Sequence, residues 1–263
     1  MKSIDTLCFD KWELEKPLLP LSWSHINQFA TKRPQWALQR IFGFKFPTSP
    51  AMERGSSVEH GLHMLLKGDT LENAKKSMYY QYDEKLKDVF HDDITKERNS
   101  LLPLLEEFYK YFEKQNWELI GFQEKVETTI MDIPIIGYTD FHFEDKETKE
   151  DFYIDLKTSK TMPKSIPNTH AMQQSIYAKA TNARQNLLYG TYYKTKPTAV
   201  VPFEVGNTNQ YLKMVNHMVL SMEHYLLRMD DKEDIVRSII PDPSDWWWNE
   251  ESLVKARIEV WGY

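Results

Sequence analysis

The chain has 263 residues, of which 41% are hydrophobic and 27% are charged, and its formal net charge is −6 at pH 7. The length allows one elaborated domain. The negative net charge argues against a protein that coats DNA nonspecifically. It does not exclude an enzyme acting on nucleic acid, for which a local basic groove would suffice. No apolar run approaches the roughly 18 residues of a membrane span. A single cysteine, Cys8, excludes a disulfide framework and a thiolate-ligated cluster. Since the first residues also lack a signal-peptide core, we expect a cytoplasmic protein without membrane contact.

The first part of the chain, to about residue 116, has the apolar spacing of helices. Pro34 is expected to divide residues 22–42 into two short helices, because proline cannot continue a helix interior. Further helices are predicted over about 52–67, 70–88 and 93–116.

From residue 117 the apolar spacing changes to the alternation of strands. Three strand-like runs follow, over 117–131, 133–143 and 151–158. A helix is then expected over about 168–182, strands over 186–194 and 198–205, and a long helix over 207–231, before an aromatic-rich tail that begins irregularly.

This order of elements predicts the fold class. Three consecutive strands followed by a helix and two more strands favour an α/β fold, in which a mixed β-sheet is flanked by helices and preceded by a helical region. No linker interrupts the chain, so we expect a single domain over 1–263. Its helical part covers about 1–116, its α/β core about 117–205, and its C-terminal helix and tail 206–263.

The second and third strand-like runs form a candidate hairpin that carries two acids. The charged segment 145–150 separates the two runs as a turn, and a symmetric turn places Asp140 opposite Asp155. Lys157 shares a face with Asp155, because residues i and i+2 of a strand point the same way. Directly opposed like charges destabilise a hairpin. A cation between the two aspartates is therefore expected.

The chemistry of this group suits a divalent metal. Mg²⁺ is bound through one or two carboxylates and keeps several waters, and a nearby lysine can orient a water and offset charge on a phosphate. The same pattern also fits a surface hairpin in which Asp155 and Lys157 form an exposed ion pair. The apolar residues that flank Asp140 and Asp155 favour the metal, since buried charges need partners.

A third acid lies on the predicted helix 52–67. Glu59 shares a face with Met52, Gly55, Ser56, Leu62 and Leu66, which is apolar and small enough to pack on a sheet. His60 lies on a more polar face, so we rank Glu59 above His60 as the helix ligand.

Polar residues after the hairpin are further candidates. Gln173 and Tyr177 are one helical turn apart, and the glutamine could position a water or contact a phosphate, or could simply face solvent. Lys160 and Lys164 follow Lys157 closely and could contact backbone phosphates, although a solvated loop fits equally well.

Taken together and in order, these motifs resemble those of a known superfamily. The chain is similar to the PD-(D/E)xK nucleases, and within them to the RecB-like and lambda-exonuclease-like branch. The resemblance covers roughly 22–205 and rests on SWSHINQF, G-x-x-x-E (Gly55, Glu59), G-Y-T-D (Asp140), I-D-L-K-T (Asp155, Lys157) and Q-x-x-x-Y (Gln173, Tyr177).

The resemblance implies a restriction-endonuclease-like core and a role for each residue. Asp140, Asp155 and Glu59 would bind Mg²⁺ or Mn²⁺, with the Leu156 carbonyl as a further ligand. Lys157 would assist the nucleophilic water, and Gln173 would belong to a supporting helix motif.

One departure from the branch concerns cysteine. Many RecB-like members carry four cysteines that hold an iron–sulfur cluster, whereas Cys8 alone cannot. The tail instead offers Trp246, Trp247 and Trp248, for which core packing or base stacking are both open.

The implied activity is that of a metal-dependent exonuclease. It would act on linear single- or double-stranded DNA in recombination, repair or phage DNA processing, in a bacterial or phage-infected cell and with a possible recombination or single-strand-binding partner. A catalytically inert DNA-binding or assembly protein and a site- or structure-specific endonuclease are the alternatives.

Overall fold

The computed structural model describes residue 14, residues 18–245, Trp248 and residues 251–263; Cys8, Trp246 and Trp247 lie outside the described residues. The contacts divide the chain into two compact units, which are described separately. Unit 1 comprises Met1–Phe46, Glu127–Gly137 and Asn209–Tyr263, and unit 2 comprises Pro47–Val126 and Tyr138–Thr208. Whether the two units fold as the single predicted domain stays a prediction.

Unit 2 begins with helices whose starts are set by capping residues. They are α4 (Pro50–Leu66), α5 (Leu71–Leu86), α6 (Ile94–Arg98) and α7 (Leu101–Glu113). The Ser49 hydroxyl accepts a hydrogen bond from the Met52 amide (3.3 Å), and the Thr70 hydroxyl accepts one from the Asn73 amide (3.2 Å). Each cap satisfies one of the amides that a helix start leaves without a partner.

The described part of the chain contains a six-stranded mixed sheet in the order β1-β3-β4-β5-β6, with β2 paired to β3. Its strands are β1 (Leu21–Ser22), β2 (Trp117–Ile130), β3 (Ile133–Asp145), β4 (Asp151–Ser159), β5 (Arg184–Thr191) and β6 (Ala199–Glu204). The β3–β4 and β5–β6 pairs are antiparallel, whereas β1–β3 and β4–β5 are parallel. The predicted α/β class with a mixed sheet is confirmed.

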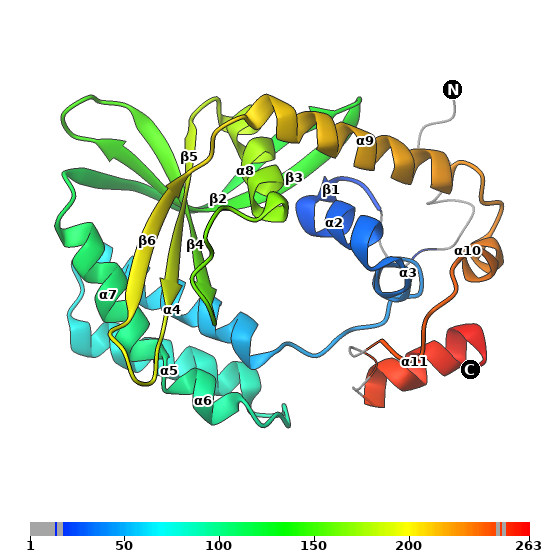
Figure 1. Ribbon diagram of the computed structural model, residues 1–263, viewed down its shortest axis with the longest axis horizontal. Helices are drawn as coiled ribbons and strands as arrows, with labels where there is room; N and C mark the ends of the chain where they lie inside the picture. The colour runs from blue at the N-terminus through cyan, green and yellow to red at the C-terminus, as the bar shows by residue number, and fades with distance from the viewer. Residues whose placement is uncertain (1–13, 15–17, 246–247, 249–250) are drawn as a thin grey trace. The chain divides into compact units, whose positions relative to one another are not determined.

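Helix α8 (Asn168–Thr181) is the crossover between the parallel strands β4 and β5, and it ends where Asn182 adopts a left-handed conformation with φ of 54°. Figure 1 shows α4 and α7 on one side of β4 and β5 and α8 on the other. Alternate residues of β4 therefore face different helices.

The core of unit 2 lies between the sheet and the helices α4, α5 and α7. Aromatic rings of Phe112, Phe141, Phe143 and Phe152 stack in it, with ring centroids 5.2 Å apart for Phe112 and Phe143. Gly190 allows α7 to approach β5 closely, because a Cβ at this position would lie 2.3 Å from the Phe108 ring. The close packing fixes β5 and its parallel partner β4.

One predicted helix is divided in the structure, and another ends before its predicted end. The segment predicted as one helix over 93–116 forms α6 and α7, and Pro103 explains the second start, because proline is tolerated only in the first turn of a helix. The segment predicted over 207–231 forms α9 (Thr208–Leu226), and a separate α10 (Lys232–Ser238) begins after Asp231, whose side chain accepts from the Asp234 amide (2.9 Å).

Unit 1 contains the helices that the prediction placed around Pro34. They are α2 (Trp23–Thr31) and α3 (Arg33–Arg40), and Pro34 lies at the start of α3, where it is tolerated. The tail forms a helix that was not predicted, α11 (Glu251–Trp261). Trp248 is 3% exposed and packs with Leu38 and Leu253, so this tryptophan belongs to a core. No helix among the described residues is long and apolar enough to cross a membrane.

Candidate active site

The predicted hairpin between β3 and β4 is confirmed with its predicted register. The paired residues run from Glu144↔Asp151 to Phe141↔Ile154. Continued by one step, this register would bring Asp140 and Asp155 opposite each other. The Leu156 amide donates a hydrogen bond to Asp140 Oδ2 at 2.8 Å, which ties the first aspartate to the strand that carries the second.

Asp155 and Lys157 lie on the same face of β4, as strand alternation predicts. The Lys157 Nζ is 2.6 Å from Asp155 Oδ2, and the two side chains are 24% and 4% exposed. Burial by itself would lower the pKa of Lys157, but the carboxylates of Asp155 and Asp140 outweigh burial and raise this pKa above the usual value. The protonated form of Lys157 is therefore favoured next to these two acids.

The pKa values of the acids Asp140 and Glu59 are also raised, which disfavours their charged forms. Burial raises the pKa of Asp140 well above its ordinary value, and the negative charges of Asp155 and Glu59 raise it further, against the opposing effects of Lys157 and the Leu156 amide. Burial likewise raises the pKa of Glu59, and Asp155 adds to the rise. Three carboxyl groups thus influence one another around a single ammonium group, and at least one more positive charge would be stabilising there.

The two candidates on α4 have different partners. Glu59 Oε1 accepts a hydrogen bond from Gln123 Nε2 of β2 at 3.0 Å, and its charge acts on Asp155 and Lys157. His60 Nε2 is 2.8 Å from Ser77 Oγ on α5. The structure thus places Glu59, and not His60, with the hairpin aspartates.

The predicted apolar face around Glu59 is only partly correct. Leu62 is fully buried, but Met52 is 67% exposed and Ser56 is also exposed. Met52 lies in the first turn of α4, although Pro50 of the same turn is buried. The prediction of a buried apolar face was therefore wrong at Met52 and Ser56.

Helix α8 contributes the predicted glutamine and tyrosine. Gln173 Nε2 donates to Tyr177 Oη at 3.2 Å, and Tyr177 is 6% exposed. Burial raises the pKa of Tyr177, the bond from Gln173 opposes the rise, and the negative charges of Asp155 and Asp140 add to it. The charges of Asp155 and Asp140 thus act on the Tyr177 hydroxyl.

Two further residues near Lys157 were not predicted from the sequence. Tyr189 is the register partner of Lys157 on the parallel strand β5, and its hydroxyl is hydrogen bonded to His170 Nδ1 on α8. Burial lowers the pKa of His170, and Lys157 lowers it further. His170 and Tyr189 thus belong to the surroundings of Lys157.

The two lysines predicted as nucleic-acid contacts lie in different surroundings. Lys160 Nζ is 3.2 Å from Asp93 Oδ2 and 3.8 Å from Glu97 Oε1 of α6. Lys164 is exposed in the loop before α8. Lys160 therefore belongs to a cluster with α6, whereas Lys164 stays a predicted contact without further support.

A family model for the PD-(D/E)XK nuclease superfamily matches residues 20–250 of the chain. The chain belongs to the PD-(D/E)XK nuclease superfamily. A search of curated proteins gives no match. Among solved structures, the chain is similar to the crystal structure of "Putative exonuclease" from Eubacterium rectale, with 14% sequence identity, a TM-score of 0.51, and coverage of 89% of this chain and 87% of that one. The crystal structure of SSO0001 matches with 16% sequence identity and a TM-score of 0.33, and the match covers 72% of this chain and 96% of that one.

Nucleases of this superfamily generally use divalent metals such as Mg²⁺. Among the described residues, no three His, Cys, Asp or Glu side chains are arranged as a ready metal site. Asp140 and Asp155 nevertheless fit a hard cation. They are opposed oxygen donors whose mutual repulsion a cation would relieve, and Mg²⁺ needs only one or two carboxylates when it keeps its waters. Glu59 is a third acid whose charge acts on Asp140.

Proposed function

We propose that this nuclease is a metal-dependent deoxyribonuclease that hydrolyses phosphodiester bonds of linear DNA as an exonuclease. The observation that carries the proposal is the β3–β4 hairpin, which brings Asp140, Asp155 and Lys157 together on buried or partly buried positions of one sheet. The negative charges of Asp155 and Glu59 raise the pKa of Asp140, so a cation beside these groups would be stabilising. A solvated surface hairpin would not show this burial.

Each residue has a distinct role in the proposed reaction. Asp140 and Asp155 would hold the metal, with Glu59 completing the acidic group. A bound Mg²⁺ or Mn²⁺ would supply Lewis acidity toward the phosphate and lower the pKa of a water. Lys157 would orient the attacking water and offset the charge that develops on the phosphate.

Helix α8 would support these residues rather than react. The Gln173 amide donates to Tyr177, whose ring lies buried beside the carboxylate group. The other amide atoms of Gln173 remain free to contact a phosphate oxygen or a water. We therefore assign Gln173 to substrate or water positioning.

The exonuclease assignment and the RecB-like branch rest on the motif resemblance, and the fold shared with the Eubacterium rectale protein is consistent with both. On the same basis we place the activity in DNA recombination, repair or phage DNA processing. A catalytically inert DNA-binding protein is the second candidate. It is favoured by the 2.6 Å ion pair between Lys157 and Asp155, which would occupy a metal ligand if it persisted.

An assay on three DNA substrates tests the proposal. End-labelled linear single-stranded DNA, linear duplex DNA and covalently closed circular DNA are incubated with the wild type and with Lys157→Ala, in Mg²⁺, Mn²⁺ or EDTA. We expect release of end-derived nucleotides from linear DNA only, in metal only, and a loss of at least about a hundredfold in the variant. The exposed Lys179→Ala on α8 is the matched control.

The other outcomes separate the alternatives. Cleavage of the closed circle would identify an endonuclease. Failure of the wild type to cleave any substrate with either metal would favour the inert DNA-binding protein. Full activity of Lys157→Ala would refute the assigned site.

A further inference from the structure

Tyr189 and His170 form a hydrogen-bonded pair beside Lys157 to which the proposed reaction gives no role. Tyr189 is 2% exposed, and its hydroxyl is hydrogen bonded to His170 Nδ1 in the first turn of α8. The two rings are stacked, with centroids 5.8 Å apart. His170 is only partly buried, and its other ring nitrogen, Nε2, has no hydrogen-bond partner among the described residues. An imidazole that is held at one nitrogen and open at the other is suited to contact a ligand.

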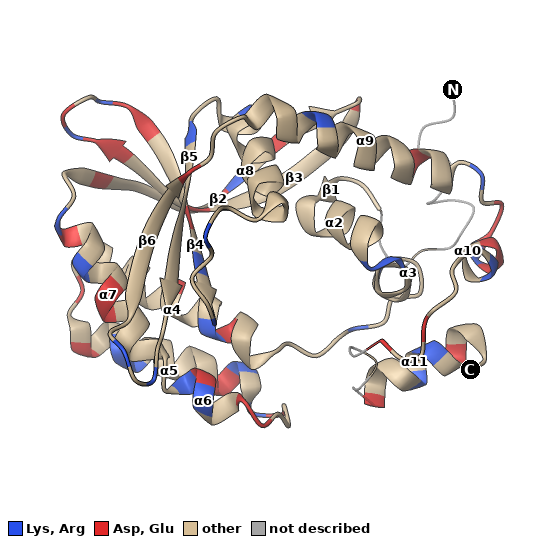
Figure 2. Ribbon diagram, viewed as in Figure 1, with Lys and Arg blue, Asp and Glu red and all other residues tan. Residues whose placement is uncertain are grey.

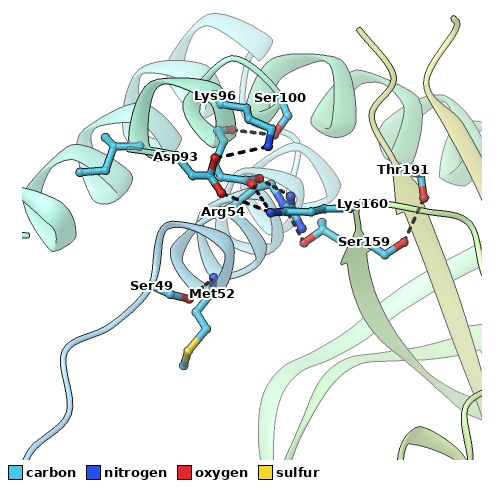
Figure 3. A network of polar contacts seen from close by, with 12 residues as sticks. Ser49, Met52, Arg54, Asp93, Lys96, Ser100, Ser159, Lys160 and Thr191 are labelled. Carbon is cyan, nitrogen blue, oxygen red and sulfur yellow. Dashed lines mark hydrogen bonds and ion pairs between the residues drawn. The ribbon is translucent and has the colours of Figure 1, made fainter. Parts of the chain in front are cut away.

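The sheet places this pair next to Lys157. Tyr189 is the register partner of Lys157 on the parallel strand β5, and such partners point to the same face of a sheet, on strands about 4.8 Å apart. Two residues further along, Ser159 Oγ and Thr191 Oγ1 are 3.0 Å apart and join the same two strands (Figure 3). The Tyr189 hydroxyl therefore holds His170 on the side of the sheet to which Lys157 points.

Helix α8 presents His170 together with two residues that are already candidates for the site. His170, Gln173 and Tyr177 are spaced at i, i+3 and i+7, so they share one face of the helix. The charges of Lys157 and Asp155 act on both His170 and Tyr177. The helix itself carries a single charged residue, a lysine in its last turn (Figure 2). The helix thus offers the site hydrogen-bonding groups rather than charge.

The burial of Tyr189 decides which ring nitrogen of His170 carries the hydrogen. Burial raises the pKa of Tyr189 to about 12, so its hydroxyl keeps the hydrogen at neutral pH. A hydroxyl that is buried away from water needs an acceptor for this hydrogen, and His170 Nδ1 is its only partner in the part of the chain that the structure describes. Nδ1 therefore accepts the hydrogen bond, and the hydrogen of the neutral imidazole lies on Nε2.

The surroundings of His170 favour its neutral form. Burial lowers the pKa of His170, and the positive charge of Lys157 lowers it further, against the opposing effect of Asp155. The Nε2–H group is thus a hydrogen-bond donor without a net charge. Such a donor can bind a phosphate oxygen next to Lys157 without repelling the lysine or a bound cation, and neutral imidazole has this electrophilic role in other enzymes.

We propose that His170 is a further catalytic residue, whose Nε2–H donates a hydrogen bond to a non-bridging oxygen of the phosphodiester that is cleaved, and that Tyr189 is its positioning residue. The inference rests on the proposed function in that it takes DNA as the substrate. The hydrogen bond strengthens as negative charge develops on the phosphate oxygens, so it stabilises the transition state. His170 transfers no proton, and the bonds that form and break are those of the proposed hydrolysis alone.

Cleavage kinetics on end-labelled linear DNA in Mn²⁺ test the catalytic role. His170→Phe keeps a ring and removes both nitrogens, and we expect kcat to fall about a hundredfold with little change in KM. His170→Gln keeps an amide donor near the Nε2 position and should restore part of this loss. Tyr189→Phe should lose less activity than His170→Phe. His91→Gln, at an exposed histidine in the loop before α6, is the matched control and should cleave at the wild-type rate.

Nitrogen NMR of the metal-free protein tests the geometry without any cleavage. With ¹⁵N-labelled histidine, the chemical shifts distinguish protonated from unprotonated ring nitrogens, and the signals missing from His170→Gln identify His170. We expect a protonated Nε2 and an unprotonated Nδ1 at neutral pH, and a larger share of the Nδ1-protonated form in Tyr189→Phe. A short single-stranded oligonucleotide, added in EDTA so that it stays intact, should shift the Nε2 signal of His170 and leave the signals of His91 unchanged.

A hydrogen on Nδ1 of His170 in the wild type would overturn the inference, and so would a His170→Phe variant that cleaves as fast as His91→Gln. This inference and the proposed function fail separately. If the wild type cleaves DNA and His170→Phe does so equally well, the nuclease activity stands and the role of His170 is refuted. If the wild type cleaves no DNA, the nuclease activity is refuted. The Nε2 signal then decides, because a shift on adding the oligonucleotide would leave the phosphate contact standing, and no shift would refute the contact as well.

Discussion

Arg54 and Glu97 form an ion pair in which the two side chains are only 6% and 4% exposed. They lie on different helices, α4 and α6, and Arg54 also donates to Thr158, the residue after Lys157 on β4. The pair thus connects the helix that carries Glu59 to the strand that carries Asp155 and Lys157. Loss of the ion pair is therefore expected to disturb the positions of the residues in the candidate active site.

Glu97→Ala is expected to lower the free energy of unfolding by about 3–5 kcal/mol, because it leaves the Arg54 guanidinium buried without its counter-charge. Urea denaturation followed by circular dichroism measures this change. Glu107→Ala is the matched control, since Glu107 pairs with the exposed Lys110 and its removal should change little. A similar small change for both variants would show that the buried pair contributes nothing to stability.

Asp140→Asn should make the metal-free protein more stable at neutral pH while abolishing metal-dependent cleavage. The folded-state pKa of Asp140 is raised by burial and by Asp155, so ionisation of this group opposes folding. The amide keeps an oxygen that can accept the Leu156 hydrogen bond. Each kcal/mol gained should raise Tm by about 2–4 °C in a chain of this size.

The sign of this effect with pH follows from proton linkage. A group whose folded pKa is raised stabilises the fold below its unfolded value and loses that contribution as pH rises through the folded value. The difference in Tm between Asp140→Asn and the wild type, measured in EDTA, should therefore be small below about pH 4 and grow at higher pH. A difference that does not change with pH would show that Asp140 is not the group responsible.

Divalent metal should raise Tm of the wild type, because a ligand that binds only the folded state stabilises it in proportion to the logarithm of its concentration. At a hundredfold excess over Kd the gain is about 2.7 kcal/mol. Thermal scans with Mg²⁺ or Mn²⁺ against EDTA measure the gain. Asp155→Asn should lose it, and the exposed Asp69→Asn on the loop before α5 should retain it. An equal rise in Tm with metal in all three proteins would show that the metal binds at another site.

The opposition of Asp140 and Asp155 could be predicted because it is local. One turn of known length joins the two strands, so the register follows from its symmetry. Lys157 joins the group by strand alternation alone. Local spacing was therefore sufficient for the hairpin part of the site.

Partners that come from distant segments could not be predicted. Tyr189 meets Lys157 only through the parallel register of β4 and β5, and Arg54 meets Glu97 through helix packing. Gln123 reaches Glu59 from a point where β2 departs from regular alternation, since its φ is 50°. No periodicity in the sequence indicates such a bulge. These contacts depend on tertiary structure.

The choice between Glu59 and His60 as the helix residue of the site can be tested directly. Glu59 faces Asp155 and Lys157, whereas His60 is bonded to Ser77, so Glu59→Gln should reduce cleavage by about 10- to 1,000-fold and His60→Gln should leave it near the wild-type rate. Gln123→Ala should weaken metal binding by about tenfold, because a partner that orients a metal-binding carboxylate typically contributes this much. Initial rates over a Mn²⁺ titration give the apparent metal affinity and the maximal rate separately. A loss of activity in His60→Gln alone would assign the metal-binding role to the histidine and limit Glu59 to its bond with Gln123.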